Sequence, residues 1–315
     1  MSRGAKAWLA EFTTDEIRDL RVIEDWRAWS TLLVNYGLIA ASMAMVAFMP
    51  NALTIVLALF IIGTRQLGLA VVMHESAHHT LFSNRRLNDF VGNWLAGYPI
   101  YLSADMYRTH HLEHHAKTGT EGDPDLPLAT PFPVSRASMA RKVARDLLGV
   151  TGLKQLIGTT VLVARVCRGK EVDAGTLPLR LERKAAIRMV VGTVVTNGAL
   201  FAVLAALGHP MLYLLWFGAW MTTNKLVARI RSIAEHAVVP DPSDPIGQTR
   251  TVRAGWLERL FIAPNQVQYH LEHHLLMTVP HYNLPRFHEM LRERGILEDA
   301  CVADNYAQVL RKAVA

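Results

Sequence analysis

Two long stretches of the chain carry no charged side chain. Residues 28–64 and 189–224 contain no Asp, Glu, Lys or Arg, which makes them 37 and 36 residues long. A single helical crossing of a bilayer takes about 20 residues. Each stretch has a proline near its middle, Pro50 and Pro210. The pattern therefore predicts an all-α integral membrane protein with four membrane-spanning helices. They form two hairpins with tight turns, over about 29–73 and about 185–233.

The charge pattern orients these hairpins. The two predicted turns contain no Lys or Arg, so all 33 of those basic residues lie elsewhere in the chain. Cytoplasmic segments of membrane proteins carry an excess of Lys and Arg. We therefore expect both termini and the polar segments on the cytoplasmic side of an inner or plasma membrane. Residues 74–184 and 234–315 then form a helical cytoplasmic cap, and residues 1–315 form a single domain.

Other segments are too short or too polar to read as clear crossings. Residues 86–102 are apolar but shorter than the about 20 residues of a crossing, which suits an interfacial segment. Residues 141–168 are amphipathic and predict a helix on the membrane surface, with a fifth crossing as the alternative. The polar segments are predicted as a lead-in over 1–27, a loop over 118–133, a polar region over 237–264, a helix over Leu284–Glu293 that ends at Gly295, and a last helix over 302–314.

Composition narrows the possible partners. The net charge of +6 suits a surface that faces an anionic membrane leaflet. No nucleic-acid recognition motif accompanies this charge, so we expect no nucleic-acid partner. Cys167 and Cys301 are the two cysteines, and they form no Cys-x-x-Cys pair. In a reducing cytoplasm we expect two free thiols and no sulfur-ligated metal site.

Histidines are concentrated in three short runs. Ten of the 14 histidines lie in His74-Glu-Ser-Ala-His78 with His79, in His110 with His111-Leu-Glu-His-His115, and in His270-Leu-Glu-His-His274. On a helix, residues three and four apart share a face, so each run presents several imidazoles in one direction. Imidazole is the commonest protein ligand of metals and suits iron, zinc and copper. His79 and His110 fall one residue off these faces, and we expect them near the site or exposed. We expect ordinary structural roles for His209, His281 and His288.

The three runs predict a site for two metals. Eight histidines on three faces are too many for one tetrahedral ion. The second and third runs flank residues 189–224, so a hairpin there returns the chain to the same side of the bilayer. A single crossing would instead separate the two runs and prevent one shared cage.

Two other classes of protein use similar residues. His74-Glu-Ser-Ala-His78 also matches the His-Glu-x-x-His motif of zinc peptidases, which uses two histidines, a catalytic Glu and one distant ligand. That site would leave the other two runs without a role. A metal transporter would need ligands strung along a pore inside the spans, whereas these runs cluster beyond the helix ends.

The complete set of motifs resembles the membrane fatty acid desaturase/hydroxylase superfamily. The resemblance runs from about Arg65 to Leu291. It rests on three segments: His74-Glu-Ser-Ala-His78; Tyr107-Arg-Thr-His-His-Leu-Glu-His-His115 with Asp123-Pro-Asp125; and Tyr269-His-Leu-Glu-His-His274 followed by Val279-Pro-His-Tyr-Asn-Leu-Pro285. It implies four spans under a cytoplasmic cap that holds two irons.

The resemblance also implies the ligands. The eight histidines of the three runs that match ligand positions of the family are His74, His78, His111, His114, His115, His270, His273 and His274. A ninth ligand of the desaturases follows the fourth span in an Asn-x-x-x-His pattern. His236 takes that place here, and Ser232 stands at the Asn position, which is a departure from the family pattern. If the Asn holds a metal-bound water, Ser232 must do so with a shorter side chain or leave the water free. Imidazole orientation is the role expected of Glu75, Glu235, Glu272 and Asp123.

Two cations lie deep in the predicted spans. Arg65 follows Asn51 by 14 residues, and Lys225 follows Met211 by 14. A buried cation in a membrane helix is costly and often functional. One interpretation is that both snorkel or pair with a carboxylate. The other is that one of them contacts a polar end of the substrate or helps to orient the metal cage.

The expected reaction is dioxygen-dependent oxidation of a lipid-like chain. An unactivated C–H bond offers no acidic proton, so a redox metal pair that activates dioxygen is the suitable catalyst. The first hypothesis is desaturation of a fatty acyl chain. The alternative is hydroxylation or ketolation of an alkyl lipid, a sphingolipid-like lipid or a carotenoid. No fused haem or iron–sulfur domain is visible. A separate ferredoxin, rubredoxin or cytochrome is therefore expected to donate electrons.

Overall fold

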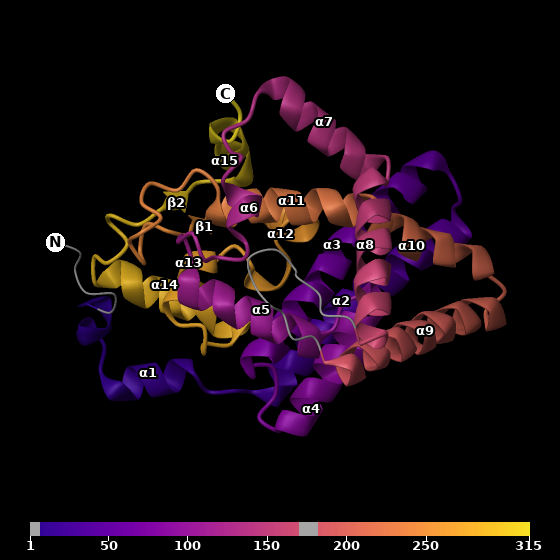
Figure 1. Cartoon of the computed structure of the whole chain (residues 1–315), viewed down its shortest axis with the longest axis horizontal. Helices are drawn as coiled ribbons and strands as arrows, with labels where there is room; N and C mark the ends of the chain where they lie inside the picture. The colour runs from indigo at the N-terminus through magenta and orange to yellow at the C-terminus, as the bar shows by residue number, and fades with distance from the viewer. Residues whose placement is uncertain (1–6, 170–181) are drawn as a thin grey trace.

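The computed structural model of the protein describes residues 7–169 and 182–315. This part of the chain is mostly helical (Figure 1). The α-helices are α1 (Thr14–Leu20), α2 (Asp25–Phe48), α3 (Ala52–His78), α4 (Arg85–Phe90), α5 (Ala104–Lys117), α6 (Leu126–Ala129), α7 (Arg136–Leu147), α8 (Val150–Cys167), α9 (Arg183–Ala206), α10 (Tyr213–Met221), α11 (Thr223–His236), α12 (Trp256–Phe261), α13 (His270–Leu275), α14 (Leu284–Glu293) and α15 (Tyr306–Lys312).

Short helices and one small sheet connect these elements. The short helices are η1 (Ala7–Glu11), η2 (Val91–Gly97), η3 (Tyr98–Ile100), η4 (Pro210–Leu212), η5 (Pro264–Gln266) and η6 (His281–Asn283), of which η2 is a π-helix. β1 (Thr251–Val252) pairs in parallel with β2 (Val302–Ala303). The sequence did not predict this sheet, because strands of two residues have no periodic pattern.

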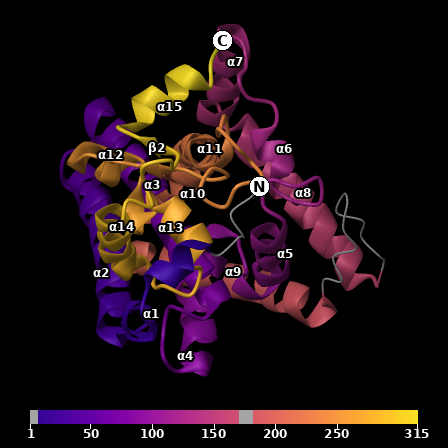
Figure 2. The same ribbon diagram turned by 90° about the vertical axis from the view of Figure 1, so that its left-hand side faces the viewer.

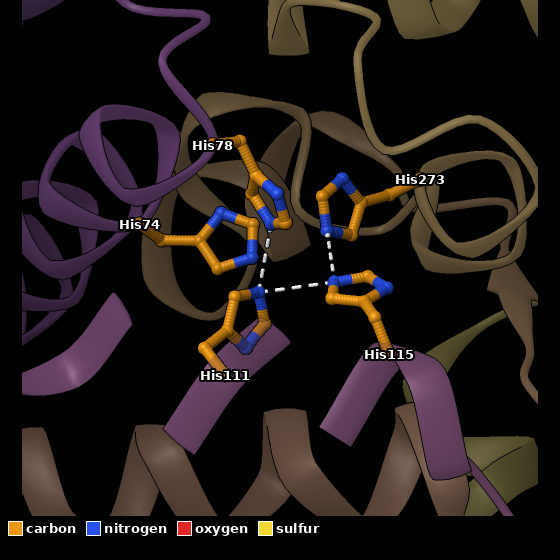
Figure 3. A group of neighbouring side chains, drawn as sticks. All are labelled: His74, His78, His111, His115 and His273. Carbon is orange, nitrogen blue, oxygen red and sulfur yellow. Dashed lines mark hydrogen bonds between the residues drawn. The ribbon is translucent and has the colours of Figure 1, made fainter. Parts of the chain in front are cut away.

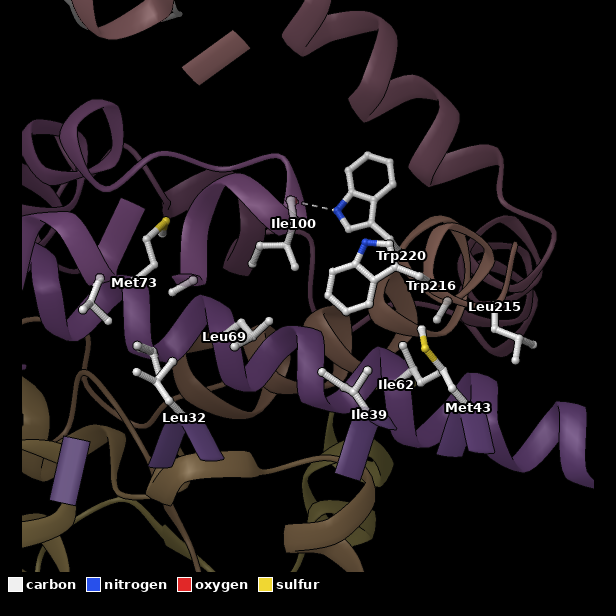
Figure 4. Packing of buried hydrophobic residues seen from close by; sticks show 14 of the residues in the cluster. Leu32, Ile39, Met43, Ile62, Leu69, Met73, Ile100, Leu215, Trp216 and Trp220 are labelled. Carbon is white, nitrogen blue, oxygen red and sulfur yellow. Dashed lines mark hydrogen bonds between the residues drawn. The ribbon is translucent and has the colours of Figure 1, made fainter. Parts of the chain in front are cut away.

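Helix α3 is the centre of the molecule. It packs against α2, α5, α10 and α11. Asn51 ends the turn after α2 and caps α3, because its side chain accepts from the backbone N–H groups of Leu53 and Thr54. Gly63 lets α11 approach closely, since an added Cβ there would lie 2.3 Å from the Thr223 hydroxyl. The apolar core around α3 includes Ile62, Leu69 and Trp216 (Figure 4).

Four segments are long and apolar enough to cross a membrane. They are Thr14–Phe48, Ala52–His78, Val150–Cys167 and Arg183–Ala206. Three of them contain spans that the sequence predicted. The predicted fourth span over about 211–233 is divided at Thr222 into α10 and α11, so it is not one continuous helix. Val150–Cys167, which is α8, was expected on the membrane surface but has the length and hydropathy of a span.

The break at Thr222 has a local cause. Its backbone leaves helical geometry at φ −121° and ψ −87°. The next two side chains then bond to backbone carbonyls of α3, Thr223 to Leu59 and Asn224 to Gly63. The first turn of α11 is thereby fixed against α3. A continuous apolar run cannot reveal such a break, because the break depends on contacts with a distant helix.

Most other segments agree with the predictions. The last long polar helix is Leu284–Glu293 as expected, and the segment 86–102 forms short helices instead of a span. The region 302–314 contains β2 and α15. Residues 1–6 of the predicted lead-in and residues 170–181 of the predicted cap lie outside the described residues.

The polar end of the molecule is built by elements that lie far apart in the sequence. The C-terminal ends of α3 and α11 meet α5 and α13 there, and Figure 2 views the molecule from this end. Apolar packing of Trp8 and Leu20 against Phe287 joins the N-terminal segment to α14. The fold thus encloses the region where the histidine runs lie.

Candidate metal centre

Nine histidines converge in two neighbouring groups. The first group consists of His74, His78, His111, His115 and His273, and the second of His114, His236, His270 and His274. In each group the possible ligand nitrogens all lie within 4.8 Å of one another. These are the eight histidines of the three runs and the ninth histidine that the resemblance implied.

Four helices supply these side chains. The last turns of α3 provide two histidines to the first group, and the last residue of α11 provides one to the second. In α5, His111 and His115 enter the first group, and His114 enters the second. In α13 the division is reversed, because only the middle histidine, His273, enters the first group. Both groups therefore share α5 and α13.

The first group has short contacts between ring nitrogens (Figure 3). The Nε2 atom of His111 lies 2.8 Å from that of His78 and 3.0 Å from that of His115. The Nε2 atom of His115 lies 3.0 Å from that of His273. The histidines thus direct their Nε2 atoms toward one small volume, as ligands of a common ion would.

The second group has a similar geometry. The Nε2 atoms of His236 and His270 are 2.8 Å apart. The ring of His274 lies 5.1 Å from the ring of His236 and 5.1 Å from the ring of His114, measured between centroids. His236 closes this group from α11, which carries none of the three histidine runs.

The donor set fits transition-metal ions. In the described part of the structure, His74 Nε2 and His274 Nε2 are buried and have no hydrogen-bond partner. A buried polar atom normally has a partner, so one orphan nitrogen in each group indicates a missing ligand contact. Burial holds the pKa values of His270, His273 and His274 well below the usual range. Their imidazoles are therefore neutral at pH 7, and each can offer a lone pair to a metal.

Three polar groups orient the imidazoles from behind. Asp123 Oδ1 lies 2.7 Å from His114 Nδ1, and the Tyr107 hydroxyl lies 3.0 Å from His111 Nδ1. The Thr118 hydroxyl lies 3.3 Å from His274 Nδ1. A partner on one ring nitrogen fixes the other as the ligand atom. Asp123 had been predicted in this role; Tyr107 and Thr118 had not, because hydroxyl groups at such positions have no distinctive spacing.

The glutamates beside the histidines divide into two cases. Glu75 and Glu235 each lie 3.5 Å from the Nδ1 atom of a group member, His74 and His270 respectively. Glu272 was expected to orient a neighbouring imidazole of its own run. Instead its carboxylate contacts the Thr251 hydroxyl and, at 2.6 Å, His288 Nδ1.

Two histidines outside the runs lie closer to the site than expected. His281 is buried and donates its backbone N–H to Glu75, and its ring nitrogen Nδ1 lies 3.4 Å from the same carboxylate. His288 holds Glu272 as described above. Ordinary structural roles had been predicted for both. The only available signal was their position shortly after the third run.

The other predicted residues lie outside the two groups. His79 is near Asp89, and His110 contacts Asp125 at 3.0 Å. Neither histidine belongs to the two groups; both had been expected near the site or exposed. Arg65 donates to the backbone carbonyls of Arg259 and Leu260 at the end of α12. It is not among the residues that line the cavity at the metal groups.

A cavity lies beside the histidines. Its volume is about 490 Å³. Its lining includes three group members, His74, His270 and His273, and α3 and α11 each contribute more lining residues than any other helix. Ser232 and Lys225 both line it. Further lining residues include Leu67, Ala70, Ile100, Leu102 and Trp220. The cavity thus places apolar side chains beside the metal groups.

Comparison with known proteins gives the family. The model of the family described as fatty acid desaturase matches residues 50–306, which is most of the chain. The protein belongs to the fatty acid desaturase family. The four apolar helices agree with the membrane location of this class.

Individual relatives are distant. A dihydrorhizobitoxine desaturase of Bradyrhizobium elkanii is 26% identical over 238 residues, which cover 72% of this chain and 65% of the relative. A chloroplastic omega-6 fatty acid desaturase of Brassica napus is 25% identical over 86% of this chain and 61% of its own length. The chain thus spans less than two thirds of these two relatives. An sn-1 oleoyl-lipid 12-desaturase of Picosynechococcus is 22% identical over 88% of this chain and 80% of its own length.

Proposed function

We propose that the protein is a membrane di-iron enzyme that desaturates a fatty acyl chain with dioxygen. The single observation that carries this proposal is the convergence of nine histidines in two groups, three of which line a cavity with apolar side chains. Family membership and the names of the omega-6 and 12-desaturase relatives support it. Desaturation removes two hydrogen atoms from adjacent carbons. Dioxygen is reduced to two waters with those two hydrogens, two protons and two further electrons.

The residues of the site have separable tasks in this reaction. Two irons bound by the nine histidines would supply the oxidising power that side chains lack. Neutral imidazoles leave the charge of the ions largely uncompensated, unlike the carboxylate-rich sites of soluble di-iron bundles. Asp123, Tyr107 and Thr118 keep three imidazoles in their ligating orientation. The second group contains four histidines and the first contains five, and Ser232, one turn before His236, would hold a water beside the smaller group.

The membrane arrangement follows from the same proposal. Helices α2 and α3 form the first hairpin, and α9 with the broken pair α10 and α11 forms the second. Both would place the histidines and the termini on the cytoplasmic side of an inner or plasma membrane. The absence of Lys and Arg from the turns at Pro50 and Pro210 supports this orientation. Helix α8 then lies along the membrane surface, because a fifth crossing would separate the second and third runs.

The reaction needs an electron donor. Among the described residues, the two cysteines are unpaired and far apart in sequence, and no cysteine belongs to the metal groups. A separate ferredoxin, rubredoxin or cytochrome would therefore supply electrons at the basic cap.

Hydroxylation or ketolation is the second candidate reaction. A beta-carotene 4-ketolase of Protosiphon botryoides is 33% identical over 79 residues, which cover 24% of this chain and 20% of the relative. The name of this relative supports keeping an oxygen-adding reaction as the second candidate. The zinc peptidase and transporter alternatives fit less well, because His74 and His78 share their group with three more histidines at the end of a cavity.

Expression in cells that lack the protein, followed by mass spectrometry of lipids, tests the proposal. Desaturation gives products that have lost two hydrogens, whereas hydroxylation gives products that have gained one oxygen. Elemental analysis of the purified protein should find two irons per chain. A matched His115→Ala variant should give neither product. A single zinc with no lipid change would support the peptidase instead.

A further inference from the structure

Lys225 is a buried cation in the wall of the cavity. Only 8% of the surface of Lys225 is exposed. Its Nζ atom lies 3.2 Å from Asn224 Oδ1 and 3.9 Å from the centre of the Trp220 ring. A lysine ammonium has three N–H donors, so this single hydrogen bond leaves two of them without an acceptor in the described part of the chain. Within residues 7–169 and 182–315, no carboxylate forms an ion pair with Lys225.

The other two cations of this wall are compensated. Arg229 forms a two-point ion pair with Asp146, which is fully buried and also accepts a hydrogen bond from Thr151. Arg231 forms an ion pair with Glu235. Of these three cations, Lys225 is thus the one that forms no ion pair within the described residues.

Such a charge is expensive without a partner. Transfer of an unpaired ammonium out of water costs much more than transfer of a neutral polar group. Lys225 also lies in the first turn of α11, where the helix dipole adds positive potential. Both effects favour an anion at this place in the cavity.

We propose that Lys225 binds the carboxylate of a fatty acid, so that the substrate enters as a free acid instead of an ester-linked chain. This inference rests on the proposed function and specifies its substrate. Asn224 positions the ammonium through its side-chain oxygen, and Trp220 covers the face of the ammonium. The hydrocarbon chain lies along the apolar wall formed by Leu67, Ala70 and Ile100 and reaches the histidines.

The cavity sets the distance between the carboxylate and the oxidised carbon. Along α3 its lining residues extend from Leu67 to Glu75, and along α11 from Asn224 to Ile233. Leu67 is seven residues before His74, and Lys225 is seven residues before Ser232 and eleven before His236. At 1.5 Å per residue, the two separations of seven residues are about 10 Å along the helix axis, and the separation of Lys225 from His236 is about 16 Å. A fully extended chain advances roughly 1.1–1.2 Å per bond, from the value per residue for polypeptide. The attack is therefore expected about 9 to 14 bonds from the carboxyl carbon.

A ligand series on the purified holoprotein tests this inference. The probes are palmitic acid, methyl palmitate, hexadecanol and hexadecyl phosphate, each measured in equilibrium binding in nanodiscs. Palmitic acid should bind roughly 10- to 100-fold more tightly than its ester or the alcohol, the usual range for a hydrogen bond to a charged group. Lys225→Met should remove this preference and leave the affinity for the ester unchanged, whereas Lys225→Arg should keep most of it. Lys184→Met, which changes an exposed lysine at the start of α9, is the matched control and should retain the preference.

The outcomes separate this inference from the proposed function. Equal affinity of the wild-type protein for acid and ester would overturn the carboxylate site, whatever product forms. Tighter binding of hexadecyl phosphate than of palmitic acid would overturn it as well, in favour of a lipid phosphate. Selective binding of the acid without any oxidised product would keep the site and reject the proposed reaction. If Lys225→Met does not fold, the ligand series on the wild-type protein decides by itself.

Discussion

The Nε2 atoms of His115 and His273 lie 3.0 Å apart, although 158 residues separate the two side chains. This contact joins α5, which precedes the second apolar stretch, to α13, which follows it. The same two helices contribute to both histidine groups. Ligation would therefore cross-link two helices that lie far apart along the chain.

Replacement of His273 by alanine should weaken metal binding at least about tenfold, since loss even of an outer partner of a ligand costs about 10- to 100-fold. His273 is the only residue that α13 gives to the first group. Elemental analysis after dialysis measures the effect. His110→Ala is the control, because His110 contacts Asp125 outside both groups. Equal metal content in the two variants would contradict the assignment.

Asp123→Asn should lower metal affinity or turnover by about 10- to 100-fold. The carboxylate of Asp123 lies 2.7 Å from His114 Nδ1 and holds that ring in the second group. An amide in its place accepts a weaker hydrogen bond from the imidazole. Metal content and turnover are the measurements. Asp299→Asn, at an exposed aspartate, should behave as the wild-type protein does. A fully active Asp123→Asn enzyme would exclude an orienting role.

Ser232→Ala should retain the metal but lower turnover, by up to about tenfold. Ser232 lines the cavity one turn before His236 and carries no ring nitrogen for the metal. Its expected task is to hold water beside the second group, the smaller of the two. Ser232→Asn, which supplies the longer side chain of the family pattern, should restore turnover. Loss of iron from Ser232→Ala would show that the hydroxyl acts on the metal site itself.

Gly192→Ala should destabilise the protein by about 1–3 kcal/mol through overpacking. An added Cβ at this position of α9 would lie 2.1 Å from a ring carbon of the buried Tyr98. Gly198→Ala in the same helix is a matched control, since nothing lies within 4 Å of its Cβ position. Thermal unfolding in detergent compares the two variants. A lower midpoint for the control than for Gly192→Ala would contradict the packing argument.

Arg65→Gln should lower stability by about 1.5–3 kcal/mol without a change in substrate preference. The buried guanidinium donates at 3.1 Å and 2.9 Å to the carbonyls of Arg259 and Leu260, and hydrogen bonds to charged groups typically contribute this much. Thermal unfolding and the ligand series described for Lys225 measure the two effects. A changed preference for the acid over the ester would instead indicate that Arg65 contacts the substrate.

Local sequence patterns predicted which residues belong to the site better than how these residues are arranged in space. Helical spacing of four placed His74 with His78, and the structure confirms that they share a group. Helical spacing does not predict that His114 belongs to the second group while His111 and His115 belong to the first. The positions of Arg65 and Lys225 looked alike in sequence, yet one holds the end of α12 and the other lines the cavity. Long-range packing makes that distinction.

The sequence by itself determined the helical membrane class and the three histidine runs, because apolar runs and helical periodicity are local properties. Its motifs also determined the family, and with it the expectation that His236 completes the ligand set. Only the tertiary structure decided how nine imidazoles divide into two groups and where α10 ends and α11 begins. It also decided that His288 holds Glu272 and that the charge of Lys225 faces a cavity. These features depend on contacts between distant side chains that form when other helices pack around α3. Local sequence patterns carry no information about such contacts.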